Sequence, residues 1–272
     1  MAGRLVLRSG GASAVLDPDA GGRIAALRVD GLCILVTDGS SSLDWGCYPM
    51  VPWAGRLRDG ILRWRGREHH FATHVLPPHA IHGTLLDAAW DVVDAGPRDA
   101  TLAANLGPAW PFGGRVVHRL ALREEGLRMT LEVLAADTEF PAIVGWHPWF
   151  PRILRDDRGT PVGDPAVVSL HAAGMLRRGL DGIPDGSIAR PIPPGPWDDC
   201  FVGVGRPPRV TWPGALDVRV QSDAPWWVVF TQHPVAVCVE PQTGPPNGLN
   251  TAEHAVVAPG APVVAQMNLD WT

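Results

Sequence analysis

Glycine and proline interrupt this chain so often that long helices and long uninterrupted strands are both disfavoured. The 272 residues include 31 Gly and 28 Pro, together 59 positions, and both residue types disfavour helix interiors and central strands. This density argues against a helical bundle or a coiled coil, and a hydrophobic content of 46% excludes a mainly disordered chain. We therefore expect an all-β protein with many turns. We treat residues 1–272 as one domain, because large β-sandwiches often reach this length without dividing.

Alternation of apolar and polar residues supports an all-β fold. The clearest case spans residues 120–133, where alternation on both sides of Glu124-Glu125-Gly126 predicts a hairpin with one face in water. Residues 156–199 are rich in Gly, Pro and Asp and predict a long irregular excursion. Further strands are expected at 5–8, 24–29, 32–36, 61–64, 90–93, 116–123, 216–221, 227–231, 235–240 and 263–271.

The charged residues and cysteines exclude several classes of function. The chain has 28 acidic and 23 basic residues, with a net charge of −5 and no basic cluster, so we expect no nucleic-acid partner. All 23 cations are Arg, which removes Schiff-base chemistry on lysine. Cys33, Cys47, Cys200 and Cys238 form no CxxC pair, so neither a zinc module nor a disulfide scaffold is expected. No apolar stretch is long enough for a signal peptide core or a membrane span, which favours a cytoplasmic protein without a membrane partner.

His147 is the first candidate for chemistry. It lies in the segment GWHPWF at 145–150, and the residue before a proline is pushed into an extended backbone. We therefore expect His147 at a strand end, on the face opposite Trp146. Its reference pKa of about 6.5 suits a proton donor near neutral pH. A structural histidine packed beside aromatic residues would give the same pattern.

Glu240 is the second candidate. Strand alternation places the valines at 235, 237 and 239 on the core face, and Ala236, Cys238 and Glu240 on the opposite face. Small side chains around a carboxylate leave room for a ligand, and Pro241 keeps the backbone of Glu240 extended. The alternative interpretations are a charge that protects an edge strand and an ion-pair partner.

Two further segments carry groups that could bind hydroxyl oxygens. Arg56 lies in the loop PWAGRLRDG at 52–60, and its planar guanidinium could donate several hydrogen bonds, although a surface arginine would fit equally. Asp198 and Asp199 lie in WDDCF, where an acidic pair either marks a turn or accepts hydrogen bonds from a polyol. The histidines at 69, 70, 74, 79 and 82 are dense, but they lack the spacing of a metal-ligand motif, so no metal site is expected.

In this order, these motifs resemble the aldose 1-epimerase (galactose mutarotase) family. The resemblance implies a large antiparallel β-sandwich, the galactose mutarotase-like supersandwich, with an open cleft for a free pyranose. It also implies that His147 is the acid that protonates the ring oxygen, that Glu240 is the base that takes the anomeric hydroxyl proton, and that Arg56, His82 and Asp198 hold sugar oxygens. The matching segments lie between residues 52 and 271 and are PWAGRLRDG, HAIHG, DAAWDVV, NLGPAWPFGG, GWHPWF, WDDCF, EPQTGPPNGLN and PGAPVVAQMNLDW.

The sequence departs from the family pattern at three places. Gly55 stands where the family often has Asn, Trp149 where Tyr is common, and Asn247 where Asp is frequent. These changes bear on which sugar fits more than on the chemistry.

The resemblance predicts an isomerase that interconverts the α and β anomers of a free aldohexose. This reaction transfers no electron and no group, so it needs no cofactor, which suits a chain without a P-loop or a dinucleotide fingerprint. We expect a small monosaccharide as partner and a monomer or homodimer. One alternative is a 1-epimerase for hexose 6-phosphates or other acidic sugars, with the arginines at 56, 58, 63, 65 and 67 as a cationic subsite. The others are a carbohydrate-binding protein without turnover and, least favoured, a metal-dependent β-barrel enzyme.

Overall fold

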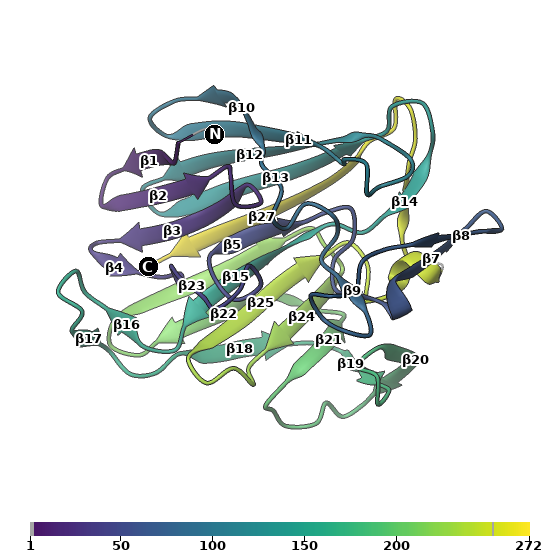
Figure 1. The fold of residues 1–272 in the computed structure, drawn as a ribbon. Coiled ribbons are helices and arrows are strands. Elements are labelled where there is room, and N and C mark those ends of the chain that lie inside the picture. Colours follow the sequence, from purple (N-terminus) through teal and green to yellow (C-terminus); the bar gives the residue numbers. More distant parts are fainter. Residues whose placement is uncertain (1–2, 252) are drawn as a thin grey trace.

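Two large antiparallel sheets lie face to face in the computed structural model, which describes residues 3–251 and 253–272 (Figure 1). The first sheet has eleven strands. They are β1 (Leu5–Ser9), β2 (Ala12–Asp17), β3 (Arg23–Val29), β4 (Leu32–Cys33), β5 (Cys47–Met50), β15 (Gly145–Pro151), β19 (Gly174–Arg178), β20 (Pro184–Ala189), β21 (Asp198–Val202), β24 (Trp226–Phe230) and β25 (Ala236–Gln242). Their order is β1-β2-β3-β5-β15-β25-β24-β21-β19-β20, with β4 paired to β3.

The second sheet has eight strands. They are β10 (Asp91–Ala95), β11 (Asp99–Asn105), β12 (Arg115–Arg123), β13 (Gly126–Leu134), β18 (Val167–His171), β22 (Arg206–Trp212), β23 (Leu216–Ser222) and β27 (Val263–Trp271). Their order is β10-β11-β12-β13-β27-β23-β22-β18. Both large sheets are antiparallel throughout the described residues, which confirms the expected all-β class.

Short strand pairs and two helical turns complete the described chain. The pairs are β6 (Arg56–Leu57) with β9 (Ala80–Ile81), β7 (Ile61–Trp64) with β8 (Arg67–His70), β14 (Phe140–Ala142) with β26 (Ala255–Val257), and β16 (Leu154–Arg155) with β17 (Pro161–Val162). The helical turns are η1 (Arg58–Gly60) and η2 (Gly248–Asn250). No helix in the described residues has the length and hydrophobicity needed to cross a membrane.

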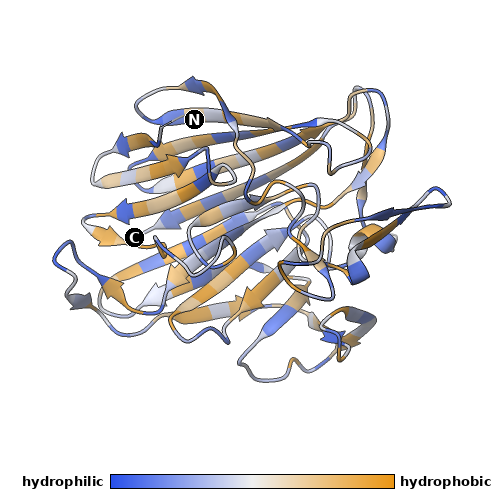
Figure 2. Ribbon diagram, in the orientation of Figure 1, coloured by the Kyte–Doolittle hydropathy of each residue, from blue (hydrophilic) through white to orange (hydrophobic). Residues whose placement is uncertain are grey.

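The core lies between the two sheets and follows from the period of two along the strands. In β13, Met129 and Leu131 are fully buried while Arg128 is exposed, and the hairpin expected at 120–133 is present as β12 and β13. Figure 2 shows the resulting alternation of hydrophilic and hydrophobic residues along the strands. Polar contacts also cross the core, since the Trp146 indole N–H donates to Nε2 of His118 at 3.1 Å. One face of each sheet therefore packs against the other sheet, and the opposite face is covered by loops or solvent.

The expectation of an irregular excursion at 156–199 was wrong. This segment contains β17, β18, β19 and β20 and the start of β21. Among these, β18 and β20 are the terminal strands of the two large sheets, and most of their residues are exposed or half-buried. Edge strands need little apolar alternation because water covers one side, so their sequence resembles that of a loop.

Two smaller expectations also need correction. The strand expected at 32–36 is regular only at Leu32–Cys33. Ile34 N–H still donates to the Leu27 carbonyl on β3 at 2.9 Å, and the chain then turns toward β15, where Val36 N–H donates to the Trp149 carbonyl at 2.9 Å. Val235 is 61% exposed and precedes β25, so only Val237 and Val239 form the core face that we expected from three valines.

Candidate active site

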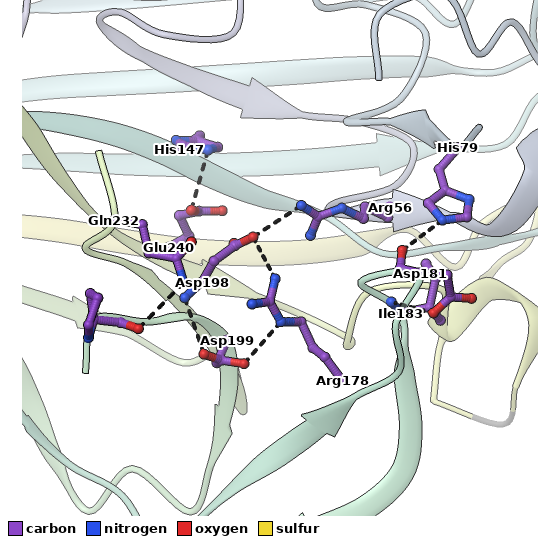
Figure 3. A network of polar contacts seen from close by, with 11 residues as sticks. Arg56, His79, His147, Arg178, Asp181, Ile183, Asp198, Asp199, Gln232 and Glu240 are labelled. Atoms are coloured by element: carbon purple, nitrogen blue, oxygen red, sulfur yellow. Dashed lines mark hydrogen bonds and ion pairs between the residues drawn. The ribbon is translucent and has the colours of Figure 1, made fainter. Parts of the chain in front are cut away.

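The register of two central strands brings His147 and Glu240 together. β15 pairs with β25 through Gly145↔Gln242 and Trp149↔Cys238, which places His147 directly opposite Glu240. Nε2 of His147 lies 3.3 Å from Oε1 of Glu240, as Figure 3 shows. The two residues are 93 positions apart in the sequence but are cross-strand neighbours in the fold.

Aromatic side chains fix the orientation of the His147 ring. Tyr48 lies opposite His147 on β5, and its ring stacks on the imidazole at 4.9 Å and 28°. Trp149 stacks on the imidazole at 5.1 Å and 8°. Neither Tyr48 nor this role of Trp149 was expected from the sequence. A hint for Tyr48 was that it is the single tyrosine of the chain.

Burial changes the protonation of the pair. His147 is 6% exposed and Glu240 is 2% exposed. Burial lowers the pKa of His147 from 6.5 to about 3, and burial, reinforced by the charge of Asp198, raises the pKa of Glu240 well above 4.5. Burial therefore favours the uncharged forms of both groups, in which the one proton of the pair lies on the Glu240 carboxyl. Moving that proton along the 3.3 Å contact turns the acid into a base and the base into an acid.

A cavity of about 200 Å³ opens directly over the pair. It lies below the range of roughly 300 to 1,000 Å³ typical of sites for drug-sized molecules, so it suits a ligand the size of one monosaccharide. The described residues that line it are Leu43, Asp44, Tyr48, Gly55, Arg56, Leu76, Ile81, His82, His147, Trp149, Asp198, Val228, Phe230, Glu240, Gln242 and Pro246. All five residues expected at the site, Glu240, His147, Arg56, His82 and Asp198, are among them.

His82 faces His147 as a neutral hydrogen-bond donor. The two rings are perpendicular with centroids 5.1 Å apart. The backbone N–H of Gly55 donates to Nδ1 of His82 at 3.2 Å, so the ring proton lies on Nε2. Burial lowers the pKa of His82 well below its ordinary value, which keeps the ring uncharged. The left-handed backbone at His82 and Gly83 makes this turn, and any side chain at Gly83 would collide with the Val51 carbonyl oxygen.

Asp198 is held by two arginines at the rim of the pocket (Figure 3). Its Oδ2 accepts from Arg56 Nη2 at 3.1 Å and from Arg178 Nη1 at 2.7 Å. Arg178 also contacts Oδ1 of Asp199 through Nε at 3.1 Å. Asp198 therefore lines the pocket while Asp199 anchors Arg178. No pattern in the sequence pointed to Arg178, because it lies in the segment expected to be irregular.

Two other arginines of the 52–67 segment form ion pairs outside the pocket lining. Arg58 pairs with Asp181, and Arg63 pairs with Glu68 at 3.0 Å. Arg63 lies on the β7–β8 hairpin, which projects from the side of the sandwich (Figure 1). Of the arginines in this segment, only Arg56 lines the pocket.

The histidines between 69 and 82 do not gather around a common point. Within the described chain, no three of them come close enough to share an ion. His79 accepts from the Asp59 backbone N–H at 3.1 Å, and its other ring nitrogen lies 2.9 Å from the Asp181 carbonyl oxygen. These contacts give His79 a structural role, so the five histidines are not a metal centre.

A larger cavity, of about 590 Å³, lies near Arg28, Cys33 and Arg152. Both of these arginines are already engaged: Arg28 contacts Asp157 at 2.5 Å, and Arg152 donates to two backbone carbonyls. It contains no buried acid and base in contact. Chemistry therefore favours the smaller pocket over the larger one.

Known proteins resemble this chain in sequence. The profile of the family described as "Aldose 1-epimerase" matches residues 3–269. The uncharacterized protein YphB of Escherichia coli (strain K12) is 25% identical over 253 residues, which cover 84% of this chain and 85% of that protein.

Solved structures resemble it in fold. A galactose mutarotase-like protein from Clostridium acetobutylicum matches with a TM-score of 0.84 and 16% identity, over 98% of this chain and 94% of that one. Galactose 1-epimerase from Lactobacillus acidophilus matches with a TM-score of 0.77 and 15% identity, over 99% and 94%. At these identities the likeness concerns the fold alone. It confirms the expected large antiparallel β-sandwich of the galactose mutarotase type.

Proposed function

Because the chain belongs to the aldose 1-epimerase family, we propose that it interconverts the α and β anomers of a free aldose. The observation that carries this proposal is the 3.3 Å contact between His147 and Glu240 at the floor of a monosaccharide-sized pocket. The reaction needs one proton removed from the anomeric hydroxyl and one delivered to the ring oxygen. A buried pair that holds one proton between an acid and a base meets that requirement without a cofactor.

The proton on the pair changes place during each half of the reaction. When the closed ring binds, the carboxylate form of Glu240 takes the O1 proton while protonated His147 gives its proton to O5. The C1–O5 bond then breaks and an aldehyde forms. Glu240 is now protonated and His147 neutral, which is the distribution that burial favours in the unliganded pocket. Rotation about C1–C2 and reclosure reverse both transfers, so the pair returns to its starting state with the opposite anomer.

The pocket rim favours an uncharged sugar over a phosphorylated one. Arg56 and Arg178 are the cations beside the site, and Asp198 and Asp199 neutralise both of them. A phosphate would have to compete with these carboxylates for the guanidinium groups, whereas hydroxyl groups can use the free lone pairs of Asp198 and the N–H of His82. The described residues thus support a free aldose more than a hexose 6-phosphate.

Saturation-transfer NMR on glucose, galactose and other aldoses tests the proposed reaction. Protein should increase the exchange of magnetisation between the two anomeric protons above the rate in buffer. Faster exchange with the 6-phosphorylated sugar would favour the acidic-sugar alternative. Sugar binding without any gain in exchange would favour a binding protein, and would contradict the proposal if it held for every sugar.

Replacing Arg178 with Met should weaken sugar binding more than turnover. The change removes the donors that orient Asp198 but leaves His147 and Glu240 in place. We expect the KM to rise about 10-fold, equivalent to 1.4 kcal/mol, with a smaller change in kcat. Arg58→Met is the matched control, because Arg58 pairs with Asp181 outside the pocket lining. An equal rise of KM in both variants would show that the loss of a positive charge, and not the loss of Asp198 orientation, weakens sugar binding.

A further inference from the structure

A buried thiol lies beside the proposed acid–base pair, and the proposed reaction does not use it. Cys238 is two residues before Glu240 on β25, so both side chains point to the same face. One ligand atom each from Cys238, His147 and Glu240 lie within 4.8 Å of one another. Cys238 is fully buried. Three different metal-binding groups therefore converge in one place.

The spacing of these atoms is close to that of a tetrahedral zinc site. Zinc bonds of about 2.0 to 2.3 Å place two ligand atoms of one ion roughly 3.3 to 3.6 Å apart. The His147–Glu240 distance of 3.3 Å already has this value. Within the 4.8 Å limit, the remaining pairs need to approach by roughly 1.2 to 1.5 Å at most. Rotation of the Cys238 and Glu240 side chains can supply a movement of this size while the stacked His147 ring stays in place.

The chemistry of the three groups selects the ion. A thiolate and an imidazole with one carboxylate suit Zn²⁺ and the softer Cd²⁺, whereas Mg²⁺ and Ca²⁺ need several oxygen ligands. We infer that Cys238, His147 and Glu240 form a binding site for Zn²⁺, and that the bound ion blocks the pocket for sugar. Binding releases the thiol proton and the Glu240 proton to solvent. His147 and Glu240 line the pocket, so the ion can reach the site through the pocket.

This arrangement makes the ion and the sugar mutually exclusive. The lone pairs of His147 and Glu240 that would move protons at O1 and O5 are the ones that the ion would occupy. Three protein ligands also leave a fourth position open on zinc, as in sites that exchange a water molecule. Zinc therefore acts here as an inhibitor and not as a resident cofactor.

Titration with Cd²⁺ tests the site through the ultraviolet absorption of a cadmium–thiolate bond. The reduced protein carries the background change Cys33→Ser, because Cys33 is the one partly exposed thiol among the four free cysteines. We expect a band that saturates at one Cd²⁺ per chain and is displaced by Zn²⁺ but not by Mg²⁺. The readout needs no turnover of sugar, so its outcome is independent of the proposed reaction.

A matched pair of cysteine variants identifies the ligand. Adding Cys238→Ser should remove the band and weaken Zn²⁺ binding at least about 100-fold, since even indirect partners of a metal cost 10- to 100-fold. Adding Cys200→Ser should leave both unchanged, because Cys200 is equally buried but lies on β21, two strands from Glu240. A band that survives Cys238→Ser would overturn the inference. If the Cys238→Ser variant does not fold, the Cys33→Ser protein still tests the inference: the absence of the cadmium–thiolate band in that protein would overturn it.

Discussion

Glu240→Gln should reduce protein-catalysed anomer exchange by about 10² to 10⁴-fold, the contribution typical of one positioned proton-transfer group. The amide keeps the size of the carboxyl and can still contact His147 across the 3.3 Å gap. It cannot take the proton from O1, so ring opening loses its base. Sugar affinity should change little, because Arg56, His82 and Asp198 remain in the pocket. Saturation-transfer NMR gives the exchange rate, and titration calorimetry gives the affinity.

The matched control for this change is Glu125→Gln, which neutralises a glutamate on the exposed turn of the β12–β13 hairpin. It should keep the full exchange rate. Full activity in Glu240→Gln would discard Glu240 as the base. A loss of affinity equal to the loss of rate would instead give Glu240 a binding role.

The same variant should be more stable than the natural chain at alkaline pH. The folded pKa of Glu240 is raised, so its contribution to stability is complete below the unfolded value of 4.5 and is lost as pH rises through the folded pKa. Gln carries no such penalty. We expect a gain of roughly 1 kcal/mol for Glu240→Gln at about pH 8, which shrinks toward pH 4. Thermal unfolding across this range measures the gain, and a gain that grows toward acid pH would contradict the raised pKa.

The fold was predictable because the strands carry their own pattern. The period-two alternation of residues 120–133 predicts which face of the hairpin is buried, and this pattern determines the register of β12 with β13. β18 and β20 could not be found in this way, since edge strands can be polar on both faces. Pattern reading is therefore reliable where both sides of a strand meet other strands and weak at the ends of a sheet.

The site was predictable only in part. His147 and Glu240 each precede a proline, which predicts an extended backbone at both positions. The roles expected for them came from the family resemblance. No local sequence pattern predicts the register of β15 against β25, and this register is what makes His147 and Glu240 neighbours. Arg178 and Tyr48 become visible only through such long-range pairing, because their importance lies in what they contact and not in their own sequence context.

The two candidate acid–base residues also differ in what their removal does to pH dependence. In the natural chain the working pair holds one proton, and a second proton reaches His147 only near its pKa of about 3. The exchange rate should therefore stay constant from neutral pH down to about pH 5. Glu240 alone would behave differently, because burial raises its pKa and its ionised fraction therefore falls as the pH decreases.

His147→Gln should lower the exchange rate by about 10² to 10⁴-fold and leave residual activity that falls as pH decreases from about 8 to about 5. Without His147 to hold the proton, only ionised Glu240 can act as base, and the ionised fraction of Glu240 falls as the pH decreases. Saturation-transfer rates, corrected for exchange in buffer, give the profile. His79→Gln, which replaces a buried histidine outside the pocket lining, should keep the flat profile. If His147→Gln also stays flat, the two residues do not share a proton, and His147 is not the acid.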